Sequence, residues 1–193
     1  MPNIGDSERK TQNRVVKFFR DKLHYTYLGN LHDSENRNIM QEQLHAWLLK
    51  QGYSEKLASN AVDALVKTST NLQQGLYHAN KEVYSLLKYG AKVKESVEQS
   101  PKTVYFIDFE DVSKNDFYIA EEVTIVSNNT KRPDIVLYVN GIALAVIELK
   151  KSSVSVSNGI RQNLTNQKSN FIEDFFTTIQ FCMAGNDSEG LRY

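Results

Sequence analysis

The sequence is poor in cysteine, with one thiol, Cys182, in 193 residues, and this excludes an internal disulfide. A lone thiol is typical of proteins from reducing compartments, so we expect a cytoplasmic protein with Cys182 packed in the core. No apolar run approaches the roughly 20 residues that a helix needs to cross a bilayer. The first residues also lack the basic and apolar segments of a signal peptide, so we expect no membrane partner.

Net charge is absent as well, because 23 basic side chains balance 23 acidic ones. No global positive field therefore announces a polyanionic partner, and any nucleic acid must be bound through a local patch or with help from other chains. The four histidines show no metal-ligand spacing, so they receive no role. They are His24, His32, His45 and His78.

Only three prolines interrupt the chain, which leaves room for long helices. Apolar residues recur at helical spacing in residues 15–23, 39–48, 57–66 and 72–87, so the first hundred residues are interpreted as helical, with Asp6 as the first cap. After Pro101, runs rich in β-branched and aromatic residues predict strands over 104–107, 117–126, 135–139, 142–149 and 177–184. A further helix is expected after the serines of 152–157. Its predicted apolar side consists of Ile160, Leu164, Phe171, Ile172 and Phe175. The pattern predicts an α/β fold, a central mixed sheet flanked by helices.

Two strongly apolar predicted strands carry charges at one end. Asp134 stands where the first begins, and Glu148 and Lys150 stand where the second finishes. Residues two apart on a strand share a face, which makes Glu148 and Lys150 neighbours. A structural Glu–Lys pair, with Asp134 capping a turn, is the ordinary explanation for such residues. Two converging carboxylates can instead hold Mg²⁺ or Mn²⁺ together with the backbone carbonyl of Leu149. Lys150 could then position a water and stabilise phosphate charge.

The register of this hairpin decides whether the carboxylates meet. A regular two-residue turn at Asn140-Gly141 sets Asp134 opposite Ile147, on the other face from Glu148. A three-residue connection, Val139-Asn140-Gly141, turns Asp134 onto the face of Glu148. We therefore predict a bulge at Val139–Gly141 or an equivalent strand distortion.

Residues 132–152, RPDIVLYVNGIALAVIELKKS, resemble the PD-(D/E)xK nuclease core. More narrowly, they resemble the N-terminal nuclease domain of type I restriction enzyme motor subunits, most densely from about residue 117 to 162. The resemblance assigns Asp134, Glu148 and Lys150 to the catalytic motif and implies a restriction-endonuclease-like core. The segment SERKTQNRVVKFF resembles the first helix of the family, with Glu8 at its acidic position. A first-turn Glu that is favoured by the helix dipole is the alternative for Glu8.

Gln162 matches the Gln of the family's QxxxY motif, where Asn166 replaces the tyrosine. The two share a helix face and could act together on DNA or on the lysine's orientation, but an exposed polar helix face is preferred for Asn166. Ser155 is interpreted as a helix cap. A phosphate-binding patch is expected from the basic residues nearby. These are Lys131, Arg132, Lys151, Arg161 and Lys168, of which Lys168 is also typical of an ordinary solvated surface.

The resemblance implies Mg²⁺-dependent cleavage of double-stranded DNA within a complex that contains methyltransferase and specificity subunits. ATP would act only in motor domains, because the chain has no GxxxxGK[ST] motif. The closing SEGLRY resembles the entry into the motor region, so we expect a single nuclease domain, residues 1–193, at the start of a longer chain. Its helical insertion would span about 27–100 and its core about 101–185. Two alternatives stay open: a catalytically silent DNA-binding or subunit-docking module, and a stand-alone repair nuclease of the same superfamily.

Overall fold

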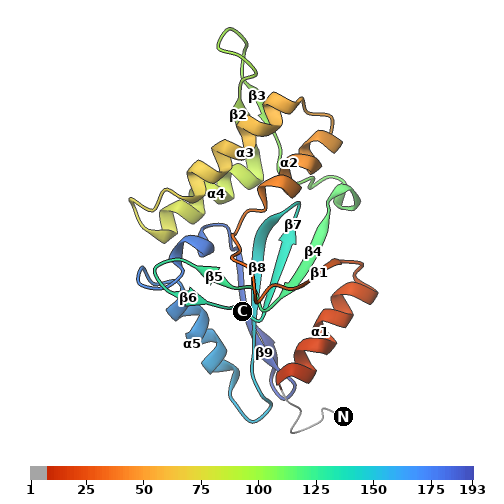
Figure 1. The fold of residues 1–193 in the computed structure, drawn as a ribbon, viewed down its shortest axis with the longest axis vertical. Coiled ribbons are helices and arrows are strands. Elements are labelled where there is room, and N and C mark those ends of the chain that lie inside the picture. Colours follow the sequence, from red (N-terminus) through yellow and green to blue (C-terminus); the bar gives the residue numbers. More distant parts are fainter. Residues whose placement is uncertain (1–7) are drawn as a thin grey trace.

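The computed structural model describes residues 8–193, and Figure 1 shows a central sheet with helices around it. Its helices are α1 (Glu8–Lys22), α2 (Gln41–Lys50), α3 (Glu55–Ser69), α4 (Leu76–Tyr89) and α5 (Val156–Asn166), with short 3₁₀ helices η1 (Val112–Lys114) and η2 (Glu173–Thr177). Its strands are β1 (Thr26–Asn30), β2 (Ala91–Val93), β3 (Lys102–Val104), β4 (Phe117–Glu121), β5 (Ile125–Val126), β6 (Thr130–Lys131), β7 (Ile135–Val139), β8 (Ile142–Leu149), β9 (Phe181–Asn186) and β10 (Gly190–Arg192). The α/β class is confirmed.

Six strands form the central sheet in the order β1-β4-β7-β8-β9-β10. The pairs β1·β4 and β8·β9 are parallel, whereas β4·β7, β7·β8 and β9·β10 are antiparallel, so the sheet is mixed as predicted. β7 and β8 are the two middle strands and are buried almost throughout. This explains their continuous apolar runs, because a strand that is covered on both faces has no polar side.

The two faces of the sheet pack against different helices. One face contributes Ile119, Ile135 and Ile147 to a core shared with Val16 of α1. The other contributes alternate residues, including Val136 and Val146, to a core with the segment around η2. Helix α5 lies against β8 and β9, on the side of the sheet away from α1 (Figure 1). The packing on the two faces therefore fixes the positions of α1 and α5 relative to the central strands.

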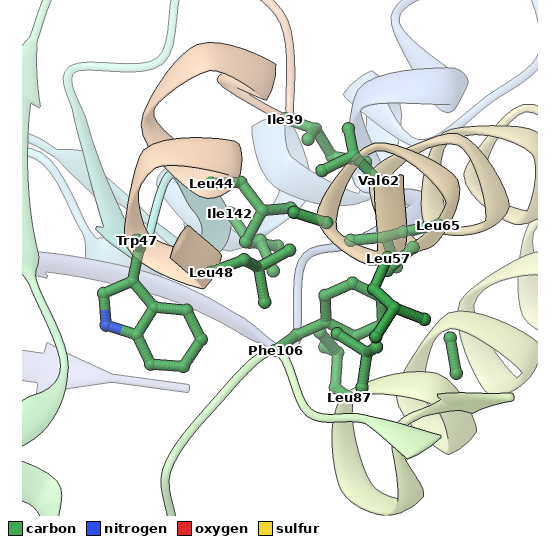
Figure 2. Packing of buried hydrophobic residues seen from close by; sticks show 14 of the residues in the cluster. Ile39, Leu44, Trp47, Leu48, Leu57, Val62, Leu65, Leu87, Phe106 and Ile142 are labelled. Atoms are coloured by element: carbon green, nitrogen blue, oxygen red, sulfur yellow. The ribbon is translucent and has the colours of Figure 1, made fainter. Parts of the chain in front are cut away.

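Helices α2, α3 and α4 form a separate layer beyond the end of the sheet where β7 turns into β8 (Figure 1). Their apolar sides meet in one core, in which Leu44, Leu48 and Leu65 are fully buried. Figure 2 shows Ile142, the first residue of β8, packed among these helical side chains with Phe106. The helical layer is thus attached to the turn end of the β7–β8 hairpin.

The turn between β7 and β8 has two residues, so the predicted three-residue connection is wrong. Val139 pairs with Ile142. Asn140 and Gly141 have φ values of +53° and +86°, the left-handed conformation that such a tight turn requires. The turn is fixed by burial: the side chain of Asn140 donates to the Phe106 carbonyl at 2.9 Å and accepts from the Asp116 N–H at 2.7 Å. Contacts with a distant loop therefore select the shorter turn.

The strand distortion that we predicted as an equivalent occurs three residues later, within β8. Tyr138 pairs with Ala143, but Leu137 pairs with Ala145, so Leu144 has no partner residue on β7. One extra residue on one strand of an antiparallel pair is a β-bulge, and it exchanges the two faces of the strand beyond it. The Leu144 carbonyl instead accepts the Gln180 N–H at 2.8 Å.

The N-terminal hundred residues are not entirely helical, since β1 at Thr26–Asn30 joins the central sheet beside β4. The predicted strand over 117–126 is two strands, because Glu122 adopts a φ of +52° after β4. The predicted strand over 104–107 begins earlier and is confined to Lys102–Val104. Leu72 precedes α4, and the strand expected from residue 177 begins at Phe181. The cap assigned to Asp6 lies outside the described residues.

The apolar side predicted for α5 is also wrong. Ile160 and Leu164 are exposed, whereas the buried face of α5 consists of Val156, Gly159, Asn163 and Asn166. Phe175 belongs to η2 instead. No helix among residues 8–193 is long and apolar enough to cross a membrane. Cys182 is half-buried at the edge of a core cluster, where burial raises the pKa of its thiol to about 11.

Candidate active site

Asp134 and Glu148 come together because of the bulge at Leu144. Ile135 pairs with Ile147, so extending this register by one residue sets Asp134 opposite Glu148. Side chains of directly opposite residues point to the same face of a sheet. The two carboxylates are therefore neighbours across the middle strands, although the turn alone would have separated them. Both are buried, with exposed fractions of 9% for Asp134 and 3% for Glu148.

The Asp134 carboxylate is held by the main chain of the opposite strand. Its Oδ2 accepts the Leu149 N–H at 2.6 Å, a short hydrogen bond. This bond fixes the carboxylate beside the peptide that joins Leu149 to Glu148. The main chain of Asp134 is fixed too, because its carbonyl accepts the Glu122 N–H at 2.9 Å.

The Lys150 ammonium joins the strand to helix α5. Its Nζ lies 2.6 Å from Oε1 of Glu148 and 3.0 Å from Oε1 of Gln162. The Lys150 side chain is 15% exposed, so part of it reaches solvent. The Lys150 N–H donates to the Gly185 carbonyl at 2.9 Å, so the main chain at this point is anchored to β9. The predicted neighbours Glu148, Lys150 and Gln162 are thus in direct contact.

Burial dominates the electrostatics of both carboxyl groups. Desolvation raises the pKa of Asp134, the nearby Glu148 charge raises it further, and the Leu149 N–H and Lys150 oppose both effects. Desolvation also raises the pKa of Glu148, with the Lys150 ammonium opposing it. Two carboxylates that compete for one cation in a buried site have unmet affinity for positive charge.

Glu8 lies in the first turn of α1, and its charge acts on the same pair. Its carboxylate contributes to the raised pKa of Asp134 and of Glu148, behind burial as the main cause in both. Glu8 therefore acts on the two carboxyl groups through its charge, as a smaller cause than burial. Among residues 8–193, however, no three His, Cys, Asp or Glu side chains gather closely enough to hold a metal by themselves.

Helix α5 approaches the site closely because Gly159 has no side chain. A Cβ atom at this position would lie 2.8 Å from Cβ of Ala184 and 3.4 Å from Cγ of Glu148. Any larger residue would push the helix away from β8 and β9. The helix starts at the predicted cap Ser155, whose hydroxyl accepts the Ser157 N–H at 3.3 Å. Glycine at one position thus brings Gln162 within reach of Lys150.

Asn166, in the place of the family's tyrosine, is buried with 3% of its surface exposed. The exposed polar face that we preferred for it is wrong, because α5 turns this residue toward the sheet. Its joint action with Gln162 on DNA finds no support either, since the side chain of Asn166 is not at the surface. Gln162 itself contacts Lys150, in agreement with a role in orienting the lysine.

The basic residues around the site differ in their surroundings. Arg132 is exposed but lies 3.4 Å from Oε2 of Glu122, and exposed Arg161 donates to Asn158 at 2.6 Å. Lys151 is exposed directly after Lys150, and Lys168 is exposed beyond α5. The Lys131 ammonium lies 4.8 Å from the centre of the Phe171 ring. Lys151, Arg161 and Arg132 are therefore all exposed, and the charge of Arg132 is shared with Glu122.

Sequence reasoning missed the polar contacts between α1 and the strand ends. Gln12 is buried, and its amide donates to Oε2 of Glu121 at 3.1 Å and to the Asp134 carbonyl at 3.3 Å. The available signal was its spacing, because Gln12 lies one helical turn after Glu8 on the side that faces the sheet. Nothing in the sequence showed that this side meets Asp134.

Comparison with known proteins identifies the family. The sequence of residues 5–193 matches the family model for the type I restriction enzyme R protein N terminus. The chain belongs to this family. It is 34% identical over 117 residues to the type I restriction enzyme HindI endonuclease subunit of Haemophilus influenzae, a match that covers 58% of this chain and 11% of that protein. It is 31% identical over 111 residues to the MjaIXP endonuclease subunit of Methanocaldococcus jannaschii, covering 53% of this chain and 11% of that one.

The matched segment therefore spans about a tenth of the length of these relatives. The chain is an N-terminal domain of the kind found in type I restriction endonuclease subunits. Both relatives are named as endonuclease subunits, which agrees with a nuclease role in general terms.

Proposed function

We propose that this domain hydrolyses DNA phosphodiester bonds with Mg²⁺ at the site formed by Asp134, Glu148 and Lys150. The observation that carries the proposal is the pairing of two buried carboxylates across β7 and β8, with an ammonium 2.6 Å from one of them. A purely structural ion pair would need one carboxylate. The second carboxylate, Asp134, adds a negative charge beside the buried Glu148 carboxylate, and two neighbouring buried negative charges are costly unless further cations neutralise them.

The donor set fits Mg²⁺ or Mn²⁺. Carboxylate oxygens are hard ligands, and Asp134, Glu148 and the Leu149 carbonyl would hold the ion while water fills its other positions. A bound ion would polarise the scissile phosphate and lower the pKa of a ligated water. Fewer than three protein carboxylates are sufficient, because Mg²⁺ keeps several waters and takes substrate phosphate oxygens as ligands. Glu8 can complete the acidic group through water.

The residues of the chain have separate tasks in this proposal. The Leu149 N–H holds the Asp134 carboxylate in place, and Gln162 together with Glu148 orients the Lys150 ammonium. Lys150 is partly open to solvent, so it can hydrogen-bond the attacking water and stabilise charge on a phosphate oxygen. Lys151, Arg161 and Arg132 lie outside this group and would contact the DNA backbone, which positions a duplex without reading its sequence.

The proposed cleavage also needs subunits that hold the DNA and domains that use ATP. We propose that the domain acts in a complex with methyltransferase and specificity subunits, and that ATP is used by motor domains elsewhere in the full-length subunit. The neutral composition of the chain supports this, because a domain without a net positive charge gains from partners that hold the DNA.

Nicking of supercoiled plasmid by the full-length subunit in its complex, with Mg²⁺ and ATP, tests the proposal. Lys150→Ala is expected to abolish cutting while the complex still binds DNA, and Lys67→Ala, which changes an exposed lysine of α3, serves as the control. Equal cutting by wild type and Lys150→Ala would refute the assigned role. DNA binding without any cutting by the wild type would favour the silent docking module instead.

A further inference from the structure

Gln12 is buried on the face of α1 that meets the ends of β4 and β7, with an exposed fraction of 3%. Its amide nitrogen lies within hydrogen-bonding distance of three acceptors. These are Oε2 of Glu121 at 3.1 Å, Oε1 of Glu122 at 3.2 Å and the Asp134 carbonyl at 3.3 Å. An amide NH₂ has two hydrogens, so the three acceptors share them. One side chain thus connects the first helix to both strand ends.

The acceptors of Gln12 lie at and just beyond the last pair of the β4–β7 ladder, Glu121 with Ile135. Glu122 follows β4 with a φ of +52°, an uncommon conformation for a residue other than glycine. Its N–H donates to the Asp134 carbonyl at 2.9 Å, and the next N–H, from Val123, donates to Pro133 at 3.1 Å. The Asp134 carbonyl therefore has two donors, one from the neighbouring segment and one from Gln12. Contacts outside the regular sheet hold the residue that must face Glu148.

The Glu121 carboxylate, another of the three acceptors, is itself held by two further contacts. Oε1 of Glu121 accepts the Tyr27 hydroxyl at 2.6 Å and pairs with Arg9 at 3.2 Å, leaving Oε2 for Gln12. Glu121 is thus a fixed point on β4 to which α1 is attached. Because α1 is rigid between Glu8 and Gln12, the same attachment sets the position of Glu8 relative to the site.

From these contacts we infer that Gln12 is a positioning residue, which fixes Asp134 for metal binding. Gln12 touches no reacting atom; it acts through the Asp134 main chain. The inference rests on the proposed function for its metal readout, but the geometry of Asp134 can be measured without metal. Groups that support metal ligands from behind typically change metal affinity about 10- to 100-fold when they are removed.

The test compares Gln12→Met with Thr11→Val in the 193-residue chain. Both variants keep side-chain volume and remove hydrogen bonds from adjacent buried positions of α1. The Thr11 hydroxyl donates to Asp187 at 2.9 Å, just beyond the end of β9, so its variant controls for a loosened helix. The direct reporter is the amide resonance of Leu149, because its N–H donates to the Asp134 carboxylate at 2.6 Å.

Without metal, we expect Gln12→Met to move the Leu149 amide resonance upfield by more than any other amide of β8, while Thr11→Val leaves it in place. With Mg²⁺, calorimetry is expected to show about 10- to 100-fold weaker binding for Gln12→Met alone. If Gln12→Met does not fold, Gln12→Asn, whose amide falls one methylene short, is expected to give the same two changes.

An unchanged Leu149 resonance in a folded Gln12 variant, or equal shifts in the Gln12 and Thr11 variants, would overturn the inference. Failure of the proposed function is distinguishable, since it would appear as absent Mg²⁺ binding in the wild type while the Leu149 shift persists.

Discussion

Replacement of Lys150 by methionine removes the cation that lies 2.6 Å from Glu148 and keeps most of the side-chain volume. Glu148 is 3% exposed, so its carboxylate cannot recover the lost interaction from water. Removing one partner of a buried pair destabilises proteins by about 3–5 kcal/mol when the other charge stays unpaired. In this site the destabilisation has an upper limit, because Glu148 can take up a proton and become neutral when the Lys150 ammonium is removed.

The largest possible loss of unfolding free energy depends on pH. A carboxyl group of ordinary pKa 4.5 is mostly ionised in the unfolded chain at any pH above that value. Forcing it to be protonated in the folded chain costs about 1.4 kcal/mol for each pH unit above it. The destabilisation by Lys150→Met should therefore be at most about 3 kcal/mol at pH 7, less the part that the raised pKa of Glu148 already costs the wild type, and stay below about 1 kcal/mol at pH 5. The sign is that of a raised carboxyl pKa: stability is lost as pH rises above the unfolded value.

Urea unfolding without divalent metal, at pH 5 and pH 7, measures this difference. Lys151→Met changes the exposed neighbouring lysine and should cost little at either pH. Adding Glu148→Gln to Lys150→Met should remove the pH dependence that Lys150→Met adds, because the Glu148 charge is no longer there to be buried; what remains belongs to Asp134. An equal loss of stability at both pH values would refute the reasoning, since it would show that Glu148 is not the group left unpaired.

Two structural predictions concern the elements that bring the site together. Gly159→Ala would place its Cβ atom 2.8 Å from Cβ of Ala184, so α5 should move outward and separate Gln162 from Lys150. The rate of plasmid nicking should fall at least tenfold. A rate equal to that of the wild type would contradict the need for a close approach of α5. Insertion of one alanine between Leu144 and Ala145 shifts residues 145–149 by one position along β7, which sets Asp134 opposite Ile147, on the other face from Glu148. We expect folded protein by circular dichroism with no cutting; a folded, fully active insertion variant would show that the residue count of β8 does not set the register.

The strand pair and its charged ends were predictable from sequence because each depends on local pattern. Strands β7 and β8 have the predicted bounds, since two long apolar runs on either side of Asn140-Gly141 leave few other arrangements. Contact among Glu148, Lys150 and Gln162 followed from spacing along one strand and a matched motif. The need for a distortion was also predictable, because without one Asp134 and Glu148 cannot share a face.

The position of that distortion was not predictable, because it depends on contacts far away in sequence. Asn140 is buried against Phe106 and Asp116, and this fixes the two-residue turn and moves the bulge to Leu144. Burial of Asn166 escaped prediction for a similar reason. Apolar spacing pointed to Ile160 and Leu164, but α5 packs through its small and amide side chains, since Gly159 lets it approach the sheet closely.

Strand β1 was missed because it lacks the usual signals of a strand. It has five residues, mostly exposed, and its register shifts between Tyr27 and Gly29. Such short, irregular edge strands are common where a sheet must avoid pairing with other molecules. Its tyrosine nevertheless matters for the site, because the Tyr27 hydroxyl holds Glu121, to which Gln12 attaches.

The most direct measurement for the central claim is Mg²⁺ calorimetry on the 193-residue chain, wild type against Asp134→Asn. The asparagine keeps the shape of the side chain and can still accept the Leu149 N–H through its amide oxygen, but it removes one of the two opposing carboxylates. We predict one Mg²⁺ bound per wild-type chain and no measurable binding by the variant. Equal binding by both proteins would contradict the account, because the metal would then be held somewhere other than between Asp134 and Glu148.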